Sequence, residues 1–284
     1  MMRILITGSG GMLGQRLVEA GWRRHHHVIP VDLPGFNLAN PQEAAAQIRA
    51  EAPDAVIHTA ALTDVDACET RVAEAMAING EALGALARAS REMDAYFLAI
   101  GTDYVFDGRK GEPYKVDDAT NPQTVYGQSK LLGEQLTLEE GGAVARLAWL
   151  NGLGGNNFVK TIAGLLAKGR DLKVVDDQLG TPTFTGDAAP ALIELAEARG
   201  EGVWHICNSG WTTWFDFAQH ICAGMGLSPV EYVTACTTAE YPKPAARPAD
   251  SRLDTSRFEE YFHPLPSWAS ALTQYMEEEG WLKI

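Results

Sequence analysis

The sequence predicts an α/β protein, with a Rossmann-type doubly wound parallel sheet followed by a smaller C-terminal α/β domain. In the first half of the chain, short β-branched runs alternate with longer amphipathic or alanine-rich stretches, as in βαβ units. A glycine-rich turn directly follows the first of these runs. After about residue 150 the alternation gives way to segments rich in Gly, Pro and Trp. We therefore expect a first domain over residues 1–149, to which later segments return, and a second domain mainly over 150–284.

The elements expected in the first domain follow from hydrophobic periodicity and from residues that end helices, such as Gly21 and Gly141. The expected strands are Arg3–Thr7, Val28–Asp32, Ala55–His58, Ala95–Ile100 and Val144–Leu147. The expected helices are Met12–Ala20, Pro41–Glu51, Val72–Met93 with a break near Gly80, and Val125–Glu139.

The second domain is expected to combine helices with irregular connections. The expected helices are Phe158–Leu166, Asp187–Glu197, Trp214–Ala223 and Ser267–Glu279. The proline-rich stretch Tyr241–Pro248 cannot form a regular helix, because each proline lacks a backbone donor and restricts the residue before it. We expect an ordered loop there, of the kind that often covers a ligand.

Composition narrows the function classes. A chain of 284 residues, 46% of them apolar, suits a packed globular protein. Its net charge of −14 disfavours nucleic acid and membrane surfaces as partners, because both are polyanions. No apolar run approaches the roughly 20 residues that span a bilayer, and no signal-peptide pattern opens the chain, so a cytoplasmic protein is expected. The cysteine spacing predicts neither disulfides nor a metal site. The oligomeric state stays open, a homodimer included.

The glycine-rich turn indicates a dinucleotide site. Its glycines let the backbone approach a pyrophosphate, and the following helix offers unpaired N–H groups to the anion. Asp32, ending the second strand, suits the adenosine ribose and repels a 2′-phosphate, which favours NADH and leaves NADPH open. The alternative for Asp32 is a turn residue before Pro34. The predicted cofactor contacts are Gly8, Gly10, Gly11, Met12, Leu13, Gly14, Asp32, Leu33, Ala60, Ala61, Thr63 and Lys130.

Tyr126 and Lys130 indicate the chemistry. They lie four residues apart on a predicted helix, so both side chains can point into one cleft. An adjacent ammonium favours the phenolate and brings a phenol nearer to the working range of an acid or base. Such a pair is also common on exposed helices. Thr102, at the carboxyl end of a predicted strand, adds a hydroxyl where open α/β sheets bind ligands. The three together predict proton transfer to a carbonyl oxygen during hydride transfer.

With these residues assembled, the chain resembles the extended short-chain dehydrogenase/reductases and, within them, the dTDP-4-dehydrorhamnose reductase family. The matching segments are TDYVFDG at Thr102–Gly108, YGQSKLLGE at Tyr126–Glu134, NNFVKT at Asn156–Thr161, DQLGTPTFTGDAA at Asp177–Ala189 and RPADSRLDTSR at Arg247–Arg257. The resemblance implies reduction of the 4-keto group of a dTDP-6-deoxy-4-keto-hexose by NADH or NADPH, in a nucleotide-sugar pathway. It leaves a Mg²⁺ requirement open.

The resemblance also implies roles for individual residues. Tyr126 is the expected proton donor, Lys130 its electrostatic partner and Thr102 the hydroxyl that positions the carbonyl. The expected substrate contacts are Thr102, Asp103, Tyr104, Tyr126, Trp149, Asn157, Lys160, Gln178, Thr181 and Arg247, in a smaller substrate-binding domain. Two residues depart from the family pattern. Asn151 replaces an aromatic residue near the sugar, and Gly101 stands where serine is common.

Several alternatives stay open. Another nucleotide-sugar 4-ketoreductase would use the same residues. A 4,6-dehydratase is disfavoured because Tyr104 stands in place of its glutamate, and an epimerase because its second domain is usually larger. A non-catalytic subunit, like the regulatory subunit of methionine adenosyltransferase, would tolerate loss of catalytic residues that are all present here. A dinucleotide-binding redox sensor would bind cofactor without sugar nucleotide.

Overall fold

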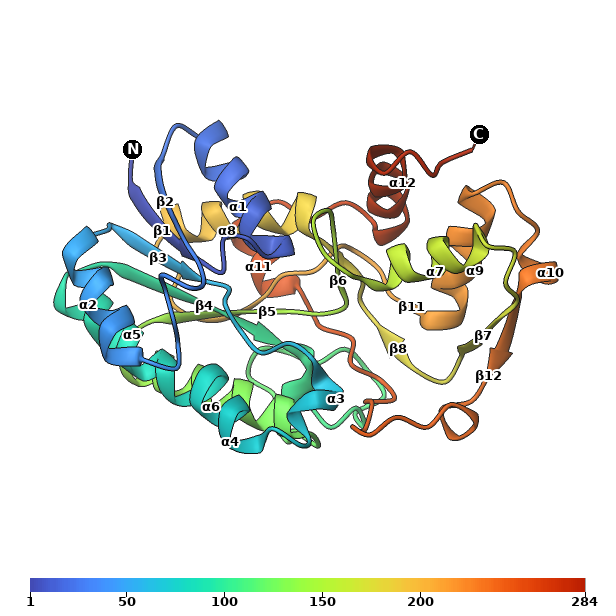
Figure 1. The fold of residues 1–284 in the computed structure, drawn as a ribbon, viewed down its shortest axis with the longest axis horizontal. Helices are drawn as coiled ribbons and strands as arrows, with labels where there is room; N and C mark the ends of the chain where they lie inside the picture. Colours follow the sequence, from blue (N-terminus) through green and yellow to red (C-terminus); the bar gives the residue numbers. More distant parts are fainter. Residues whose placement is uncertain (284) are drawn as a thin grey trace.

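The computed structural model describes residues 1–283, and its centre is a parallel sheet of six strands (Figure 1). The strand order is β10-β5-β4-β3-β1-β2. The strands are β1 (Arg3–Thr7), β2 (His27–Val31), β3 (Ala55–His58), β4 (Tyr96–Thr102), β5 (Ala143–Leu147) and β10 (Gly202–His205). Every neighbouring pair is parallel. All the carboxyl ends therefore meet at one edge, and the order reverses between β1 and β3, which is where such sheets bind ligands.

Helices cover both faces of this sheet (Figure 1). One face carries α1 (Met12–Arg23), α8 (Thr185–Glu197) and α11 (Ser256–Tyr261), whose apolar side chains form one core with the sheet. The other face carries α2 (Pro41–Glu51), α5 (Ala82–Glu92) and α6 (Val125–Glu139), with a second core below the sheet. Because both faces are covered, β1, β3 and β5 are buried almost continuously along their length rather than at alternate residues.

The helix expected over residues 72–93 is interrupted by a π-helical segment. α4 (Val72–Ala75) continues into η1 (Met76–Glu81) and then into α5, so the break predicted near Gly80 is confirmed. α6 packs very closely on this segment, since a Cβ on Gly133 would lie 2.2 Å from the Asn79 carbonyl oxygen. Only glycine allows that approach. A short helix, α3 (Val65–Cys68), precedes α4 and was not expected.

The second lobe packs around its own apolar core, beside the carboxyl edge of the sheet (Figure 1). Its helices are α7 (Phe158–Leu166), α9 (Trp214–Gly224), α10 (Pro229–Tyr232) and α12 (Trp268–Glu278). Its strands pair in twos: β6 (Leu150–Asn151) with β9 (Thr183–Phe184), β7 (Leu172–Val175) with β12 (Val233–Cys236), and β8 (Leu179–Gly180) with β11 (Thr212–Thr213). Short 3-10 turns lie at Asp103–Val105 and Thr238–Glu240.

Two expectations needed correction. Gly21 does not end the first helix. It lies inside α1, where a Cβ would come within 2.6 Å of Val28 Cγ2, so it permits the helix to pack on β2. The sixth strand, β10, was also missed, although it pairs with β5 in the main sheet. Gly141 does follow the end of α6 with φ +78°, as a left-handed terminating residue should.

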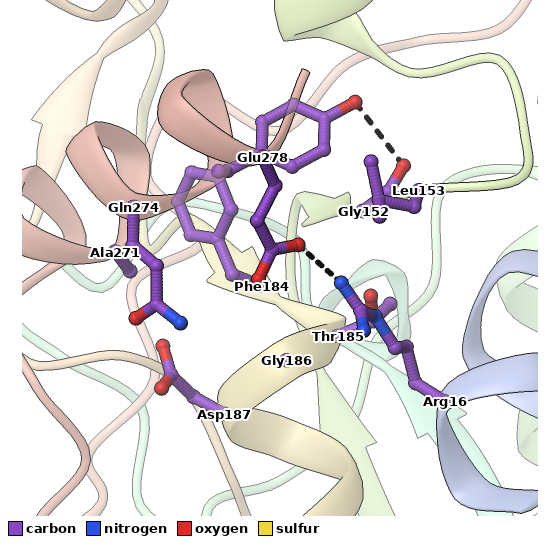
Figure 2. Close-up of a pocket in the computed structure, with 11 residues that line it drawn as sticks. Arg16, Gly152, Leu153, Phe184, Thr185, Gly186, Asp187, Ala271, Gln274 and Glu278 are labelled. Carbon is purple, nitrogen blue, oxygen red and sulfur yellow. Dashed lines mark hydrogen bonds and ion pairs between the residues drawn. The ribbon is translucent and has the colours of Figure 1, made fainter. Parts of the chain in front are cut away.

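Residues around a small cavity of about 20 Å³, between α1, α8 and α12, also join the two lobes (Figure 2). Arg16 on α1 reaches across to Glu278 on α12, and it also pairs with Glu19 at 2.8 Å. Its guanidinium is thus engaged with carboxylates rather than with the glycine-rich turn. Among residues 1–283, no helix combines the length and apolar character needed to cross a bilayer.

Gly133→Ala should lower the free energy of unfolding by about 3 kcal/mol, because the added methyl meets rigid backbone at Asn79. Urea unfolding checks this. The matched control is Gly164→Ala in α7, where a Cβ meets nothing within 4 Å. That change should raise stability by about 0.5–1 kcal/mol through helix propensity. Equal effects of the two substitutions would contradict the packing argument.

Candidate active site

A cavity of about 880 Å³ lies at the carboxyl edge of the sheet and extends into the second lobe. The predicted residues that line it are Gly8, Gly11, Met12, Leu13, Gly14, Asp32, Leu33, Ala60, Ala61, Thr63, Thr102, Asp103, Tyr104, Tyr126, Lys130 and Trp149. The structure thus brings together the glycine-rich turn and the proposed catalytic side chains in one space.

The glycine-rich turn forms a cradle that side chains would fill. Gly8 has φ +64°, and a Cβ there would lie 2.8 Å from the Ala60 nitrogen. A Cβ on Gly14 would lie 2.1 Å from the Gly8 carbonyl oxygen. The turn can therefore close tightly onto the start of α1, leaving N–H groups at the helix N-terminus for an anion. These features fit a dinucleotide pyrophosphate.

Asp32 lies over this turn. Its Oδ2 accepts a hydrogen bond from the Gly10 N–H at 2.7 Å, and its Oδ1 accepts one from the Leu33 N–H at 2.8 Å. Gly10 itself does not line the cavity, but a Cβ there would lie 2.8 Å from Asp32 Oδ2. The carboxylate is thereby fixed beside the turn, where an adenosine ribose would lie.

A buried asparagine that sequence reasoning missed joins the cofactor side to α6. Asn79 accepts from the Leu62 N–H at 2.7 Å, and its amide donates to the Leu62 carbonyl at 3.0 Å and to Ser129 Oγ at 3.1 Å. Ser129 Oγ in turn donates to the Tyr126 carbonyl at 2.8 Å. These hydrogen bonds therefore fix the position of the loop after β3 relative to the helix that carries Tyr126.

Thr102 ends β4 and Asp103 begins the 3-10 turn that follows, and both line the cavity. The Thr102 hydroxyl donates to Asp103 Oδ1 at 3.2 Å, while Asp103 Oδ2 has no hydrogen-bond partner within residues 1–283. Burial raises the pKa of Asp103 to about 6, and the hydrogen bond from Thr102 opposes that rise. This carboxylate can therefore accept from a bound hydroxyl.

Tyr126 and Lys130 point into the cavity from α6, whose N-terminus is capped by Thr124. The pKa of Tyr126 lies above its ordinary value because the phenol is partly buried. A hydrogen bond with Thr102 opposes this rise in part. Lys130 Nζ donates to the Ile100 carbonyl at 2.6 Å, and burial lowers its pKa to about 8. The site thus has a buried hydroxyl, a buried ammonium and a half-buried phenol within one cluster.

An aromatic wall closes the second-lobe end of the cavity. The rings of Trp149 and Trp214 stack with centroids 3.4 Å apart, and Phe158 packs on Trp214 at 4.5 Å. Trp149 has φ +44°, and a Cβ on Gly180 would lie 2.1 Å from its ring. The wall gives the cavity a flat apolar surface.

Five of the predicted substrate contacts do not line the cavity. Asn157 caps α7, accepting from the Lys160 N–H at 2.9 Å, and the Lys160 side chain is exposed. Gln178 Nε2 donates to Thr238 Oγ1 at 2.8 Å, and Thr181, directly after β8, is buried. Arg247 pairs with Asp66 at 3.0 Å. The irregular stretch Tyr241–Pro248 therefore crosses to α3 in the first lobe.

Sequence reasoning missed a further set of cavity residues from α4, η1 and the loop after β2. They include Phe36, Asn37, Leu38, Arg71, Glu74 and Ile78. No motif identifies them, because they reach the cavity through the path of the loop and the π-helical segment. Asn151 lines the cavity too, but its amide donates to the Trp149 carbonyl at 2.7 Å.

The parallel sheet, the glycine cradle beside Asp32, and the Thr102, Tyr126 and Lys130 cluster together define an extended short-chain dehydrogenase/reductase. Similarity to known proteins narrows this class. The chain belongs to the RmlD substrate binding domain family, whose model matches residues 2–280.

Three relatives illustrate the similarity. The chain is 40% identical over 290 residues to a dTDP-4-dehydrorhamnose reductase of Aggregatibacter actinomycetemcomitans, covering 96% of this chain and 97% of that protein. It is 37% identical over 278 residues to a probable dTDP-4,6-dihydroxy-2-methyloxan-3-one 4-ketoreductase of Streptomyces antibioticus, covering 96% and 94%. A solved dTDP-4-dehydrorhamnose reductase from Bacillus anthracis, in complex with NADP, is 32% identical with a TM-score of 0.93, covering 98% and 99%.

Asp103→Asn should change how stability depends on pH. The folded-state pKa of Asp103 is raised from 3.8 to about 6, so the folded chain keeps this proton up to a higher pH than the unfolded chain does. The wild type should therefore lose stability relative to the variant as pH rises from about 4 to 7, by about 3 kcal/mol. Urea unfolding at several pH values measures the difference. Asp171→Asn, at an exposed residue, is the control, and a pH-independent difference would contradict the prediction.

Proposed function

We propose that this protein reduces the 4-keto group of a dTDP-6-deoxy-4-keto-hexose with NADH or NADPH, converting dTDP-4-dehydrorhamnose to dTDP-L-rhamnose. The convergence of Thr102, Tyr126 and Lys130 in the cavity that begins at the glycine cradle carries this proposal. Relatives named dTDP-4-dehydrorhamnose reductase, similar over nearly their whole length, support the substrate. The NADP complex of the Bacillus anthracis protein supports the cofactor.

The proposed mechanism depends on the hydroxyls of Thr102 and Tyr126, which both line the cavity. A bound cofactor supplies the hydride. The Thr102 and Tyr126 hydroxyls hold the carbonyl oxygen, and Tyr126 gives its proton to that oxygen as negative charge develops. The Lys130 ammonium, whose Nζ donates to the Ile100 carbonyl, stabilises the resulting phenolate and would hold the hydroxyls of the nicotinamide ribose. Ligands that fill the cavity would displace water from this cluster, which would strengthen each of these interactions.

The two ends of the cavity suggest how the ligands lie. The glycine cradle and Asp32 at one end would hold the cofactor, and Trp149 at the other end would contact the nucleotide sugar. Asp103 and Tyr104 then lie beside the sugar. Asn157, Lys160, Gln178, Thr181 and Arg247 do not line the cavity, so their contact with the substrate stays a prediction. A cytoplasmic location is part of this proposal, supported by four free, buried cysteines.

A second candidate is another nucleotide-sugar 4-ketoreductase. Asn151, in place of an aromatic residue, alters the sugar end of the cavity. The Streptomyces antibioticus relative, named a probable 4-ketoreductase of a different dTDP sugar, has similar identity to this chain. The cluster of Thr102, Tyr126 and Lys130 serves either substrate, so only the sugar differs between the two candidates.

The deciding experiment measures NADH and NADPH oxidation by the purified protein with dTDP-4-keto-6-deoxyglucose, with and without a 3,5-epimerase, and identifies the product by NMR. Oxidation only with the epimerase, giving dTDP-L-rhamnose, is the expected result. Oxidation without it would favour the second candidate. Tight cofactor binding with no oxidation would favour a non-catalytic regulatory subunit.

Tyr126→Phe should cut turnover by roughly 10² to 10⁴ with little loss of cofactor binding, because the ring stays and only the acid is removed. Steady-state kinetics and NADH fluorescence titration measure the two effects. Tyr261→Phe, at an exposed tyrosine outside the cavity, should leave both unchanged. Near-normal turnover of the Tyr126 variant would show that Tyr126 is not the proton donor.

Asp32→Asn should shift cofactor preference towards NADPH by roughly tenfold in kcat/KM, or about 1.4 kcal/mol. The variant keeps an acceptor for the Gly10 N–H but removes the charge that repels a 2′-phosphate. The ratio of kcat/KM values for NADH and NADPH checks this, with Asp171→Asn as control. An unchanged ratio would count against a ribose contact.

A further inference from the structure

Glu134 is a buried carboxylate that the proposed mechanism does not use. It follows Tyr126 and Lys130 on α6 at four-residue intervals, so the three side chains share one face of the helix. It is 2% exposed and does not line the cavity. Burying a carboxylate is costly unless it is paired and hydrogen-bonded, so its presence behind the catalytic pair calls for a role.

Arg146 on β5 holds this carboxylate in place. Its Nη2 donates to Glu134 Oε2 at 2.8 Å, and its Nε donates to the same oxygen at 3.0 Å and to Oε1 at 3.2 Å. The guanidinium also lies over the Phe106 ring, 5.1 Å from its centroid. Burial raises the pKa of Glu134, whereas Arg146 and Lys130 lower it. The fork-shaped donor set indicates an ionised carboxylate.

Gly101 leaves room for the carboxylate at the end of β4. A Cβ at this position would lie 2.6 Å from Glu134 Oε1 and 2.9 Å from Arg146 Cγ. The glycine found where serine is common therefore lets the ion pair approach the strand backbone. There the Thr102 N–H also lowers the pKa of Glu134.

Glu134 lies one helical turn beyond Lys130 on the same face of α6, so its negative charge is near the ammonium. Burial lowers the pKa of Lys130 to about 8, and the Glu134 charge opposes this. His58 on β3 is buried, and burial followed by the Lys130 charge lowers its pKa to about 3, so it is neutral at neutral pH. Tyr126 on α6 and Asp103 after β4 belong to the same cluster. Arg146 on β5 forms an ion pair with Glu134.

Resting on the function proposed above, we propose that Glu134 is a positioning residue for the reduction: its carboxylate, held by Arg146, keeps Lys130 charged beside Tyr126. A neutral Lys130 no longer stabilises the phenolate, so Tyr126 becomes a weaker acid and turnover falls. The ion pair thereby sets the upper pH limit of the reaction without touching the substrate or the cofactor.

Glu134→Gln tests this. The basic limb of the kcat profile should move to lower pH by roughly one unit, because Lys130 then loses its proton earlier. Glu134→Asp keeps the charge and should leave the limb near its wild-type position even where packing is weakened. Glu139→Gln, at an exposed residue on the same helix, is the matched control. A limb that stays in place in Glu134→Gln would overturn the proposal.

A second readout does not depend on the substrate. Titration of ¹⁵N-labelled lysine side chains by NMR, with Lys130 assigned from a Lys130→Arg variant, should show a lower midpoint in Glu134→Gln. If wild-type protein reduces no keto sugar but this midpoint moves, the proposed function fails and the assignment to Glu134 stands. If the wild type turns over but the midpoint does not move, the proposed function stands and the role of Glu134 is overturned.

A double variant covers the case in which Glu134→Gln does not fold because Arg146 is left as an unpaired buried charge. Glu134→Gln with Arg146→Gln removes both charges together. The Glu134 charge is what opposes the effect of burial on Lys130, and loss of the Arg146 charge acts in the other direction, so the midpoint should fall by less than in the single variant. An unchanged midpoint in this protein would also overturn the proposal.

Discussion

The close packing of α6 against η1 and the end of β4 is the constraint on which the rest of the structure depends. This helix carries Tyr126 and Lys130, so a small shift would move the proposed acid away from Thr102. Its position is fixed by backbone contacts rather than by side-chain volume alone. A Cβ on Gly127 would lie 2.3 Å from the Tyr104 carbonyl oxygen, and Gly133 makes a comparable approach to Asn79. Such contacts leave one docking position for the helix.

This packing explains why so many polar groups are buried near the site. Once α6 lies against the sheet, Lys130 is buried, and it is stabilised by the Ile100 carbonyl on β4 and by the charge of Glu134 on its own helix. Arg146 then extends the network to His205 on β10, with 3.4 Å between Nη1 and Nε2, and His205 contacts the Asp254 carbonyl at 3.1 Å. Such buried charges are weak evidence for stability, so the network is better understood as fixing geometry.

The sequence predicted the parts of the molecule that depend on local pattern. The strands β1 to β5, the helices α2, α6 and α7, and the glycine cradle follow from periodicity and from motifs that lie close together in the chain. What it could not predict depends on distant partners. β10 is short and has little pattern of its own, and it becomes a strand because β5 offers an unpaired edge. Trp214 enters the cavity by stacking on Trp149, and Arg247 is drawn to Asp66, contacts that no spacing reveals.

The return of the chain to the sheet after residue 150 has a consequence for how such a protein can be divided. α8 and β10 complete one face and one edge of the sheet, and α11 covers β10, although all three follow the first segments of the second lobe. A fragment ending at residue 149 would keep the proposed catalytic side chains but leave β5 as an open edge, ready to pair with other chains. The dinucleotide half is therefore not a transferable module, and shuffling of such halves between proteins would have to carry these later segments along.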